Sequence, residues 1–309
     1  MAAILPEASF ELDGYGFGGP LPATGATVVI EDVDFGDPDI ETKDVARPRA
    51  DGMAFGRDWR RGRSISLSLA VLTVYTVPAV AGMGGYGTAT ALAELGQLSR
   101  RWQADGVRTV PGAVSMLRYR LAGRQRVVYG RGRKLSAVTT QATLGRIPVT
   151  AEFACSDHLF YDDTQRTNLV NFIPPGAGGL TFPISFPWST VTIGYSPGEV
   201  TVDGDVATWL TVVIKGPIAQ PEVRCIGGWT IGLDYSIPNG RYVVIDPRPW
   251  SRGVRLDDGT NLAGALTRTS PRLSEIKIEP GLSEIVLTGR DETGSSNMLL
   301  AWRAAFTSP

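Results

Sequence analysis

The sequence predicts a mainly β protein with two domains, and three of its features lead to this prediction. Short runs with apolar residues at every second position recur along the chain, as at Ile65, Leu67, Leu69 and Val71, which is typical of half-buried strands. Clusters of glycine, proline, asparagine and aspartate separate these runs at the intervals found in β-sandwiches. Only one stretch has helical spacing, and 309 residues exceed the usual size of a single domain.

The first domain, residues 1–160, is predicted to be a β-domain with one packed helix. The helix covers residues 88–104; Thr88 or Thr90 would cap it, and Leu92, Leu95, Leu98 and Trp102 would share its buried face. Residues 34–56 are acidic and rich in turn formers, so we expect a long exposed loop there. The expected strands are 26–30, 63–77, a hairpin of 116–121 with 125–129, and a pair of 135–143 with 147–155.

Residues 161–178 are predicted to be a linker, and residues 179–309 a second domain built as a sandwich or jelly roll. Pro174 and Pro175, followed by glycines, disfavour regular pairing in the linker. The second domain contains strands and turns throughout, and its last strand is expected at 298–306. Three hairpins are expected in it: 199–202 with 206–214, 230–237 with 241–245, and 273–278 with 283–288.

The charge balance argues against a dedicated nucleic-acid binder, because the formal net charge is −1. Charges are segregated, however. Eleven Lys or Arg stand against one acid between Arg100 and Arg146, and nine acids against four bases between Glu31 and Asp58. Such blocks suit surfaces that meet other subunits, although two solvated faces explain them equally well.

Two further features concern the compartment and the membrane. Cys155 and Cys225 stand in apolar runs of different domains, so we expect buried free thiols and assembly in a reducing cytosol. The N-terminus lacks the features of a signal peptide. The uncharged stretch 64–93 alternates in polarity and contains Pro78, which indicates a strand and no membrane span.

Three patterns could carry chemistry, and each has an ordinary structural explanation. Gly82–Gly87 matches G-x-G-x-x-G before the helix, but hairpins follow it where a dinucleotide fold needs further βα units. His158 stands near Asp157, Asp162 and Asp163, which could hold Ca²⁺ or Mg²⁺ but also suit a polar strand end. No catalytic constellation emerges, so neither an enzyme nor a cofactor is expected.

Aromatic residues of the second domain are the remaining candidates. Trp188 and Trp250 follow prolines in loop-like stretches, where an exposed indole could stack on a sugar ring. Core packing is the alternative explanation, because tryptophan buries a large apolar area.

Several segments, taken in order along the chain, resemble the distal tail proteins of siphophages that infect actinobacteria, often described as minor tail proteins. The segments are Phe10–Gly19, Gly52–Asp58, Gly62–Ile65, Leu117–Arg120, Val128–Arg131, Ala151–Phe153, Asp157–Asp162, Gly179–Pro183, Gly216–Pro217, Val244–Asp246 and Ser251–Val254. His158 replaces a proline that similar proteins have after Asp157.

The resemblance implies an N-terminal domain that forms a hexameric ring around the tail channel, and a galectin-like sandwich outside the ring. The implied role is a structural virion protein of the tail tip or baseplate. Its implied partners are copies of itself, the tail tube protein, the tail-tip hub, receptor-binding or side-fibre proteins and the tape measure protein, with DNA only passing through. We hypothesise that Arg118, Arg120 and Arg131 meet the acidic loop of a neighbouring subunit; the alternative is that the basic stretch faces passing DNA. The alternative role is a carbohydrate-binding adaptor whose sandwich contacts host-surface glycans.

Overall fold

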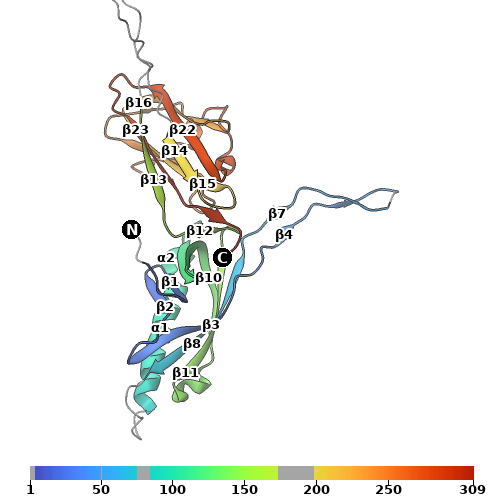
Figure 1. The fold of residues 1–309 in the computed structure, drawn as a ribbon, viewed down its shortest axis with the longest axis vertical. Helices are drawn as coiled ribbons and strands as arrows, with labels where there is room; N and C mark the ends of the chain where they lie inside the picture. The colour runs from blue at the N-terminus through green and yellow to red at the C-terminus, as the bar shows by residue number, and fades with distance from the viewer. Residues whose placement is uncertain (1–3, 50, 75–83, 173–197) are drawn as a thin grey trace, which may run out of the picture. The chain divides into compact units, whose positions relative to one another are not determined.

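The computed structural model describes residues 4–49, 51–74, 84–172 and 198–309 of the chain. The chain forms two units, each with its own hydrophobic core (Figure 1). The first unit contains Met1–Thr164 together with Phe306–Pro309, and the second contains Gln165–Ala305. The last four residues of the chain therefore belong to the unit in which the chain begins, whereas the sequence led us to place them in the second domain.

A sheet of nine strands, seven of them in the order β2-β1-β9-β10-β11-β8-β3, forms the first unit. Its strands are β1 (Ser9–Leu12), β2 (Tyr15–Gly18), β3 (Gly25–Asp34), β8 (Ser64–Val74), β9 (Ser115–Leu121), β10 (Arg124–Ala137), β11 (Arg146–Cys155), β12 (Phe160–Asp162) and β24 (Ala305–Phe306). The last two lie off this path: β12 pairs with β10 and β24. Because β2 also lies against β3, the sheet is strongly curled, as its right-handed twist favours.

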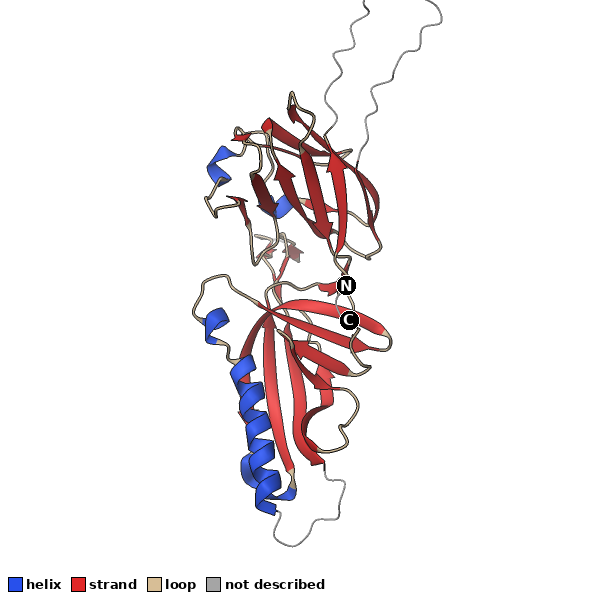
Figure 2. Cartoon of the chain, turned by 90° about the vertical axis from the view of Figure 1, so that its left-hand side faces the viewer, coloured by secondary structure: helices blue, strands red, loops and turns tan. Residues whose placement is uncertain are grey.

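Helix α1 (Gly84–Trp102) lies along the curled sheet and contacts β3, β8 and β10 (Figure 2). It begins four residues before the predicted start, so the proposed caps at Thr88 and Thr90 lie inside it. Leu98 and Trp102 are buried as predicted, but Leu92 is 44% exposed and Ala91 takes its place on the packed face. Close packing here requires Gly132 of β10, since a Cβ at that position would stand 2.3 Å from the Trp102 carbonyl oxygen. A short helix α2 (Asp105–Arg108) follows, and a 3₁₀ helix η1 (Thr139–Leu144) replaces the end of the predicted 135–143 strand.

The second unit is a β-sandwich of two antiparallel sheets. One sheet has the order β13-β23-β15-β19-β20 with β21 also paired to β15, and the other has the order β14-β22-β16-β17 with β18 also paired to β16. The strands are β13 (Arg166–Asn171), β14 (Gly198–Val202), β15 (Thr208–Lys215), β16 (Ile218–Cys225), β17 (Thr230–Gly232), β18 (Ser236–Ile237), β19 (Tyr242–Asp246), β20 (Gly253–Leu256), β21 (Lys277–Ile278), β22 (Gly281–Arg290) and β23 (Asn297–Trp302). Two 3₁₀ turns, η2 (Ala263–Ala265) and η3 (Leu273–Glu275), complete the unit. Inward-facing residues of both sheets form one core, so the prediction of a mainly β chain ending in a sandwich is confirmed.

The pairing of strands differs from the prediction in this sandwich. The three expected hairpins are wrong, because β14 and β15, β18 and β19, and β21 and β22 each lie in different sheets. The expected linker is also wrong where it includes β13, which pairs along its whole length with β23. In the first unit, by contrast, the predicted hairpin is confirmed, with Leu121 of β9 opposite Arg124 of β10.

Both cysteines are buried free thiols, as predicted. Burial raises the pKa of the Cys155 thiol to about 12, which makes this thiol a poor nucleophile. No helix in the described part of the chain is long and apolar enough to cross a membrane.

Candidate functional site: the arm and its base

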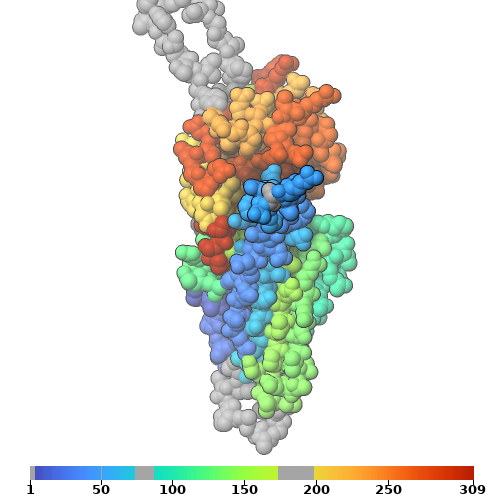
Figure 3. Space-filling model, turned by 90° about the vertical axis from the view of Figure 1, so that its right-hand side faces the viewer, coloured from blue at the N-terminus to red at the C-terminus, as the bar shows by residue number. Residues whose placement is uncertain are grey.

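An extended arm leaves the first unit between β3 and β8, where the sequence predicted an exposed loop. Two short antiparallel ladders hold it together, β4 (Ile40–Glu41) with β7 (Trp59–Arg60) and β5 (Val45–Ala46) with β6 (Met53–Ala54). Figure 1 shows this hairpin standing away from the sheet that carries it, and Figure 3 looks at the first unit with the arm toward the viewer. The prediction of exposure holds, but the segment is a paired arm, and sequence analysis missed it because strands of two residues leave no periodic signal.

Local contacts explain why these residues form an arm. The Asp44 carboxylate accepts a hydrogen bond from the Gly56 backbone N–H at 2.9 Å across the hairpin. Glu41 accepts hydrogen bonds from Lys43 and Arg61, which lower the pKa of its carboxyl group. At the tip, Arg49 and Gly52 both adopt positive φ, as a tight reversal of the chain requires.

The arm is unusual because large apolar side chains cover it. Five of them are exposed, by 47% to 86% of their surface: Ile40, Val45, Met53, Phe55 and Trp59. Single exposed apolar residues are ordinary, but five of them on one projecting hairpin make this element a candidate contact surface.

The base of the arm is fixed by a buried arginine. The Arg63 side chain donates from Nε and Nη2 to the His158 carbonyl oxygen, at 3.0 and 2.6 Å, and from Nη1 to the Gly36 carbonyl oxygen at 3.2 Å. Gly36 has φ of +56°, and a Cβ there would stand 2.4 Å from the Ser64 carbonyl oxygen. Glycine and arginine together thus determine where the arm leaves the sheet.

The three arginines proposed for subunit contact all make contacts within their own chain. Arg118 is 5% exposed and forms a buried ion pair with Asp163 and a partly buried one with Glu11, at 2.7 and 2.8 Å. The interface role of Arg118 stays a prediction, and its side chain is largely occupied by contacts within its own chain. These carboxylates raise the pKa of the Arg118 guanidinium further, chiefly through the hydrogen bond to Asp163.

The other two arginines are half-buried, and their role at an interface stays a prediction. Arg120 pairs with Glu7 at 3.3 Å and donates to the Leu5 carbonyl oxygen. Arg131 donates to the carbonyl oxygens of Ala113 and Val110 at 2.6 and 2.7 Å. Both side chains thus hold loops of their own subunit in place.

The carboxylates near His158 serve separate partners. Asp157 pairs with His158 at 2.9 Å and accepts from the Tyr161 hydroxyl at 2.5 Å, whereas Asp163 binds Arg118. No group of three metal-ligating side chains occurs among the residues that the structure describes. The described contacts of the Asp157–Asp163 stretch join residues of the same chain.

The remaining sequence candidates have mixed outcomes. Trp188 and Gly82 lie outside the described residues, and Gly84, Gly85 and Gly87 are in the first turn of α1. The strands that follow α1 pair antiparallel, so the parallel βα arrangement of a dinucleotide site does not form here. Trp250 is half-buried with the Arg248 guanidinium 5.8 Å from its ring.

No protein-family model matches the sequence, and neither does any curated protein. Among solved structures, the Dit protein of phage SPP1, described as a paradigm of the hub adsorption apparatus in phages that infect Gram-positive bacteria, matches with a TM-score of 0.56 and 13% identity. The match covers 96% of this chain and 98% of the SPP1 protein. The phage P2 baseplate in its activated conformation matches at a TM-score of 0.44 and 12% identity, over 89% of this chain and 90% of that one. From end to end, the chain has the Dit-like fold of the SPP1 protein.

Proposed function

We propose that this protein is a structural subunit of a phage tail tip, in which copies assemble into a hexameric ring. The ring joins the tail tube to the tail-tip hub and carries receptor-binding or side-fibre proteins, and the protein performs no catalysis. The Dit-like fold over nearly the whole chain supports this role. The tape measure protein is a further candidate partner, and DNA passes only through the channel of the ring.

The observation that carries the proposal is the apolar arm. Its exposed side chains include Phe55 at 86% and Val45 at 64%, on a hairpin attached to its unit only at one end. Transfer of one such side chain from water to a protein surface contributes about 1.5–3 kcal/mol. An arm that lies on the next copy, while another arm lies on its own subunit, makes a heterologous contact that closes into a ring.

The experiment compares the mass of the full chain with that of an arm variant. Mass photometry over a range of concentrations is expected to show particles of six times 33.0 kDa. Phe55→Ser should weaken each contact by about 2 kcal/mol, which is roughly thirtyfold in the dissociation constant. The hexamer should then dissociate at correspondingly higher concentrations.

Leu144→Ser is the matched control, because Leu144 is 82% exposed in the same unit but lies in η1, outside the arm. This variant should assemble like the wild type. A chain that stays monomeric at every concentration, or an equal loss in both variants, would contradict the proposal.

The carbohydrate-binding role remains a prediction for Trp250. Its indole is only half-exposed and has Arg248 beside it, held by the Asp246 carboxylate. Binding of the full chain to a glycan array, with loss of signal in Trp250→Ala, would support this role. If the full chain binds no glycan on the array, the carbohydrate-binding role is contradicted and only the ring function remains.

A further inference from the structure

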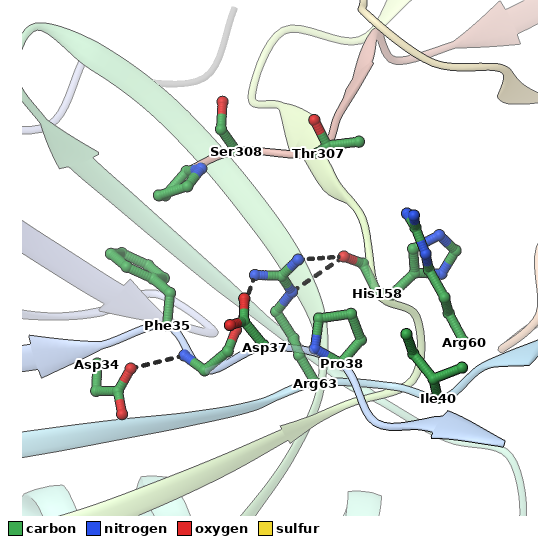
Figure 4. Close-up of a pocket in the computed structure, with 12 residues that line it drawn as sticks. Asp34, Phe35, Asp37, Pro38, Ile40, Arg60, Arg63, His158, Thr307 and Ser308 are labelled. Atoms are coloured by element: carbon green, nitrogen blue, oxygen red, sulfur yellow. Dashed lines mark hydrogen bonds between the residues drawn. The ribbon is translucent and has the colours of Figure 1, made fainter.

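A hollow at the base of the arm is lined in part by a buried cationic side chain, that of Arg63. The hollow, about 700 Å³ in volume, is lined by Asp34–Pro38, Ile40, Arg60, Arg63, His158 and Thr307–Pro309. All of these residues belong to the first unit. Figure 4 shows the Arg63 guanidinium beside the His158 carbonyl group, with Phe35, Pro38 and Ile40 around it.

The Arg63 guanidinium has hydrogen-bonding capacity that its own chain does not use. A guanidinium carries five N–H donors, and three of them bind the carbonyl oxygens of His158 and Gly36. Two donors remain, one on Nη1 and one on Nη2. One face of the group is covered, because the Phe160 ring lies 4.0 Å from Cζ.

The positive charge of Arg63 also lacks an ion-pair partner. Arg63 is only 6% exposed, yet no carboxylate in the described part of the chain lies within 4 Å of its nitrogens. Burial lowers the pKa of the guanidinium, while Asp37 and Asp157 act at longer range to raise it. A buried charge without a counterion is costly, and an arginine keeps its charge in proteins. A ligand with a negative group would relieve this cost.

The walls of the hollow restrict the kind of anion. Phe35, Pro38 and Ile40 offer apolar contact beside the cation, whereas exposed Asp34 and Asp37 stand at the rim. These rim carboxylates disfavour a doubly charged group such as phosphate more than a singly charged one. Arginine also matches a carboxylate geometrically, through two parallel N–H donors.

We propose that this hollow is a carboxylate-binding site, in which Arg63 holds the carboxylate and Phe35, Pro38 and Ile40 contact the apolar group attached to it. Arg60 at the rim adds a second positive charge. The carboxylate belongs either to a small molecule or to an aspartate or glutamate of a second copy. The site does not depend on ring formation, because one chain supplies all of its residues.

The test measures binding of 4-fluorobenzoate to the full chain by ¹⁹F NMR, with inorganic phosphate as a competitor. Wild-type protein should bind the probe, and phosphate should displace it poorly. Arg63→Lys keeps the charge but loses the forked donor pair, so affinity should fall about tenfold. Arg60→Ala should weaken binding by about threefold, because this side chain is exposed and screened.

Two further variants keep the test decisive if Arg63→Lys does not fold. Ile40→Glu, at a position 59% exposed, places a carboxylate of the chain itself in the hollow and should abolish binding. Arg57→Ala removes an exposed arm arginine that does not line the hollow, and should leave binding unchanged. Equal affinity for neutral 4-fluorobenzyl alcohol, no probe binding, or full binding by Ile40→Glu would overturn the proposal.

A second measurement identifies the source of the carboxylate. If millimolar fluorobenzoate lowers the mass of the assembled protein, the natural occupant is a carboxylate of a second copy. If the probe binds while the mass stays constant, the occupant is a separate small carboxylate. If the chain is monomeric and still binds the probe, the result would contradict the proposed hexameric ring and support the proposed carboxylate-binding site.

Discussion

The two units differ in how strands that follow one another along the chain find their partners. In the first unit, β9 and β10 are joined by Ala122 and Gly123 and pair directly, with φ of 50° and 75° in the turn. In the second unit β16 pairs directly with β17 and β19 with β20, but the three expected hairpins do not form: β14 and β15, β18 and β19, and β21 and β22 each lie in different sheets. In both units the connections between these strands contain the glycine, proline, asparagine or aspartate residues that are typical of turns. Turn chemistry therefore predicts where the chain reverses, and the burial of apolar faces decides which sheet the next strand joins.

The physical reason is visible at the shortest of these connections. Only Glu279 and Pro280 separate β21 from β22, a length that normally gives a hairpin. Proline has no backbone N–H to donate to a ladder. β21 pairs instead with β15, and β22 with β14 and β16, so that Ile278 and Ile285 reach the shared core from different sheets.

The burial of arginine ion pairs differs between the units as well, and replacing one arginine in each unit should show the largest effect. Arg118 joins Glu11 of β1 to Asp163 after β12, and its side chain is 6% exposed, whereas Arg224 of β16 pairs with Glu222 at 57% exposure. Arg118→Met should destabilise the first unit by about 3–5 kcal/mol, because two carboxylates lose their buried partner. Arg224→Met should cost at most about 0.5 kcal/mol.

Hydrogen exchange in rising urea, followed by mass spectrometry of peptides from each unit, measures both costs separately. Similar costs for the two variants would show that the Arg118 pairs are no more important than a surface contact.

The second unit also contains a carboxylate with a structural role, Asp291 in the turn between β22 and β23. Burial favours its neutral form, but hydrogen bonds from Thr293 and the Ser296 backbone N–H outweigh burial and lower its pKa. The stabilisation is therefore complete above the unfolded-state pKa, about 3.9, and is lost as the pH falls through the lower folded-state pKa.

Asp291→Asn should destabilise the second unit by about 2 kcal/mol at pH 7. The difference from the wild type should shrink steadily below about pH 4, in urea titrations at a series of pH values. A difference that is constant down to pH 2 would mean that ionisation of Asp291 plays no part.

The smallest expected effect is at the β9–β10 turn of the first unit. Ala122 has a left-handed φ, which costs about 1 kcal/mol for alanine and less for asparagine. Ala122→Asn creates the Asn-Gly pair that two-residue hairpins favour, so the first unit should gain about 0.5–1 kcal/mol. The urea midpoint of the first unit should rise while that of the second stays the same; a lower midpoint would show that this turn does not control the hairpin.

The sequence predicts the first unit better than the second for a physical reason. Periodicity and local turns locate β8, α1 and the β9–β10 hairpin, because these depend on residues close in sequence. The partners of β14 and β22 depend on a core assembled from eleven strands, which no local pattern encodes. The return of Phe306 to the first unit, where the Arg126 guanidinium lies 3.6 Å from its ring, is equally non-local.

The candidate site shows the same limit. Charge counting identified the basic stretch that contains Arg118 but could not distinguish a buried ion pair from a surface contact. Arg63 could not be identified as a site residue from the sequence, because a single arginine between glycine and serine forms no chemical pattern. The arm was correctly predicted to be exposed, yet its exposed apolar residues become significant only once their positions are known.

Cryo-electron microscopy of the assembled full chain would show where the apolar arm lies in the ring. We expect a closed ring of six copies, with Phe55 and Trp59 of every arm buried against the next copy. A ring whose arms project freely into solvent, or particles of a single chain only, would contradict it.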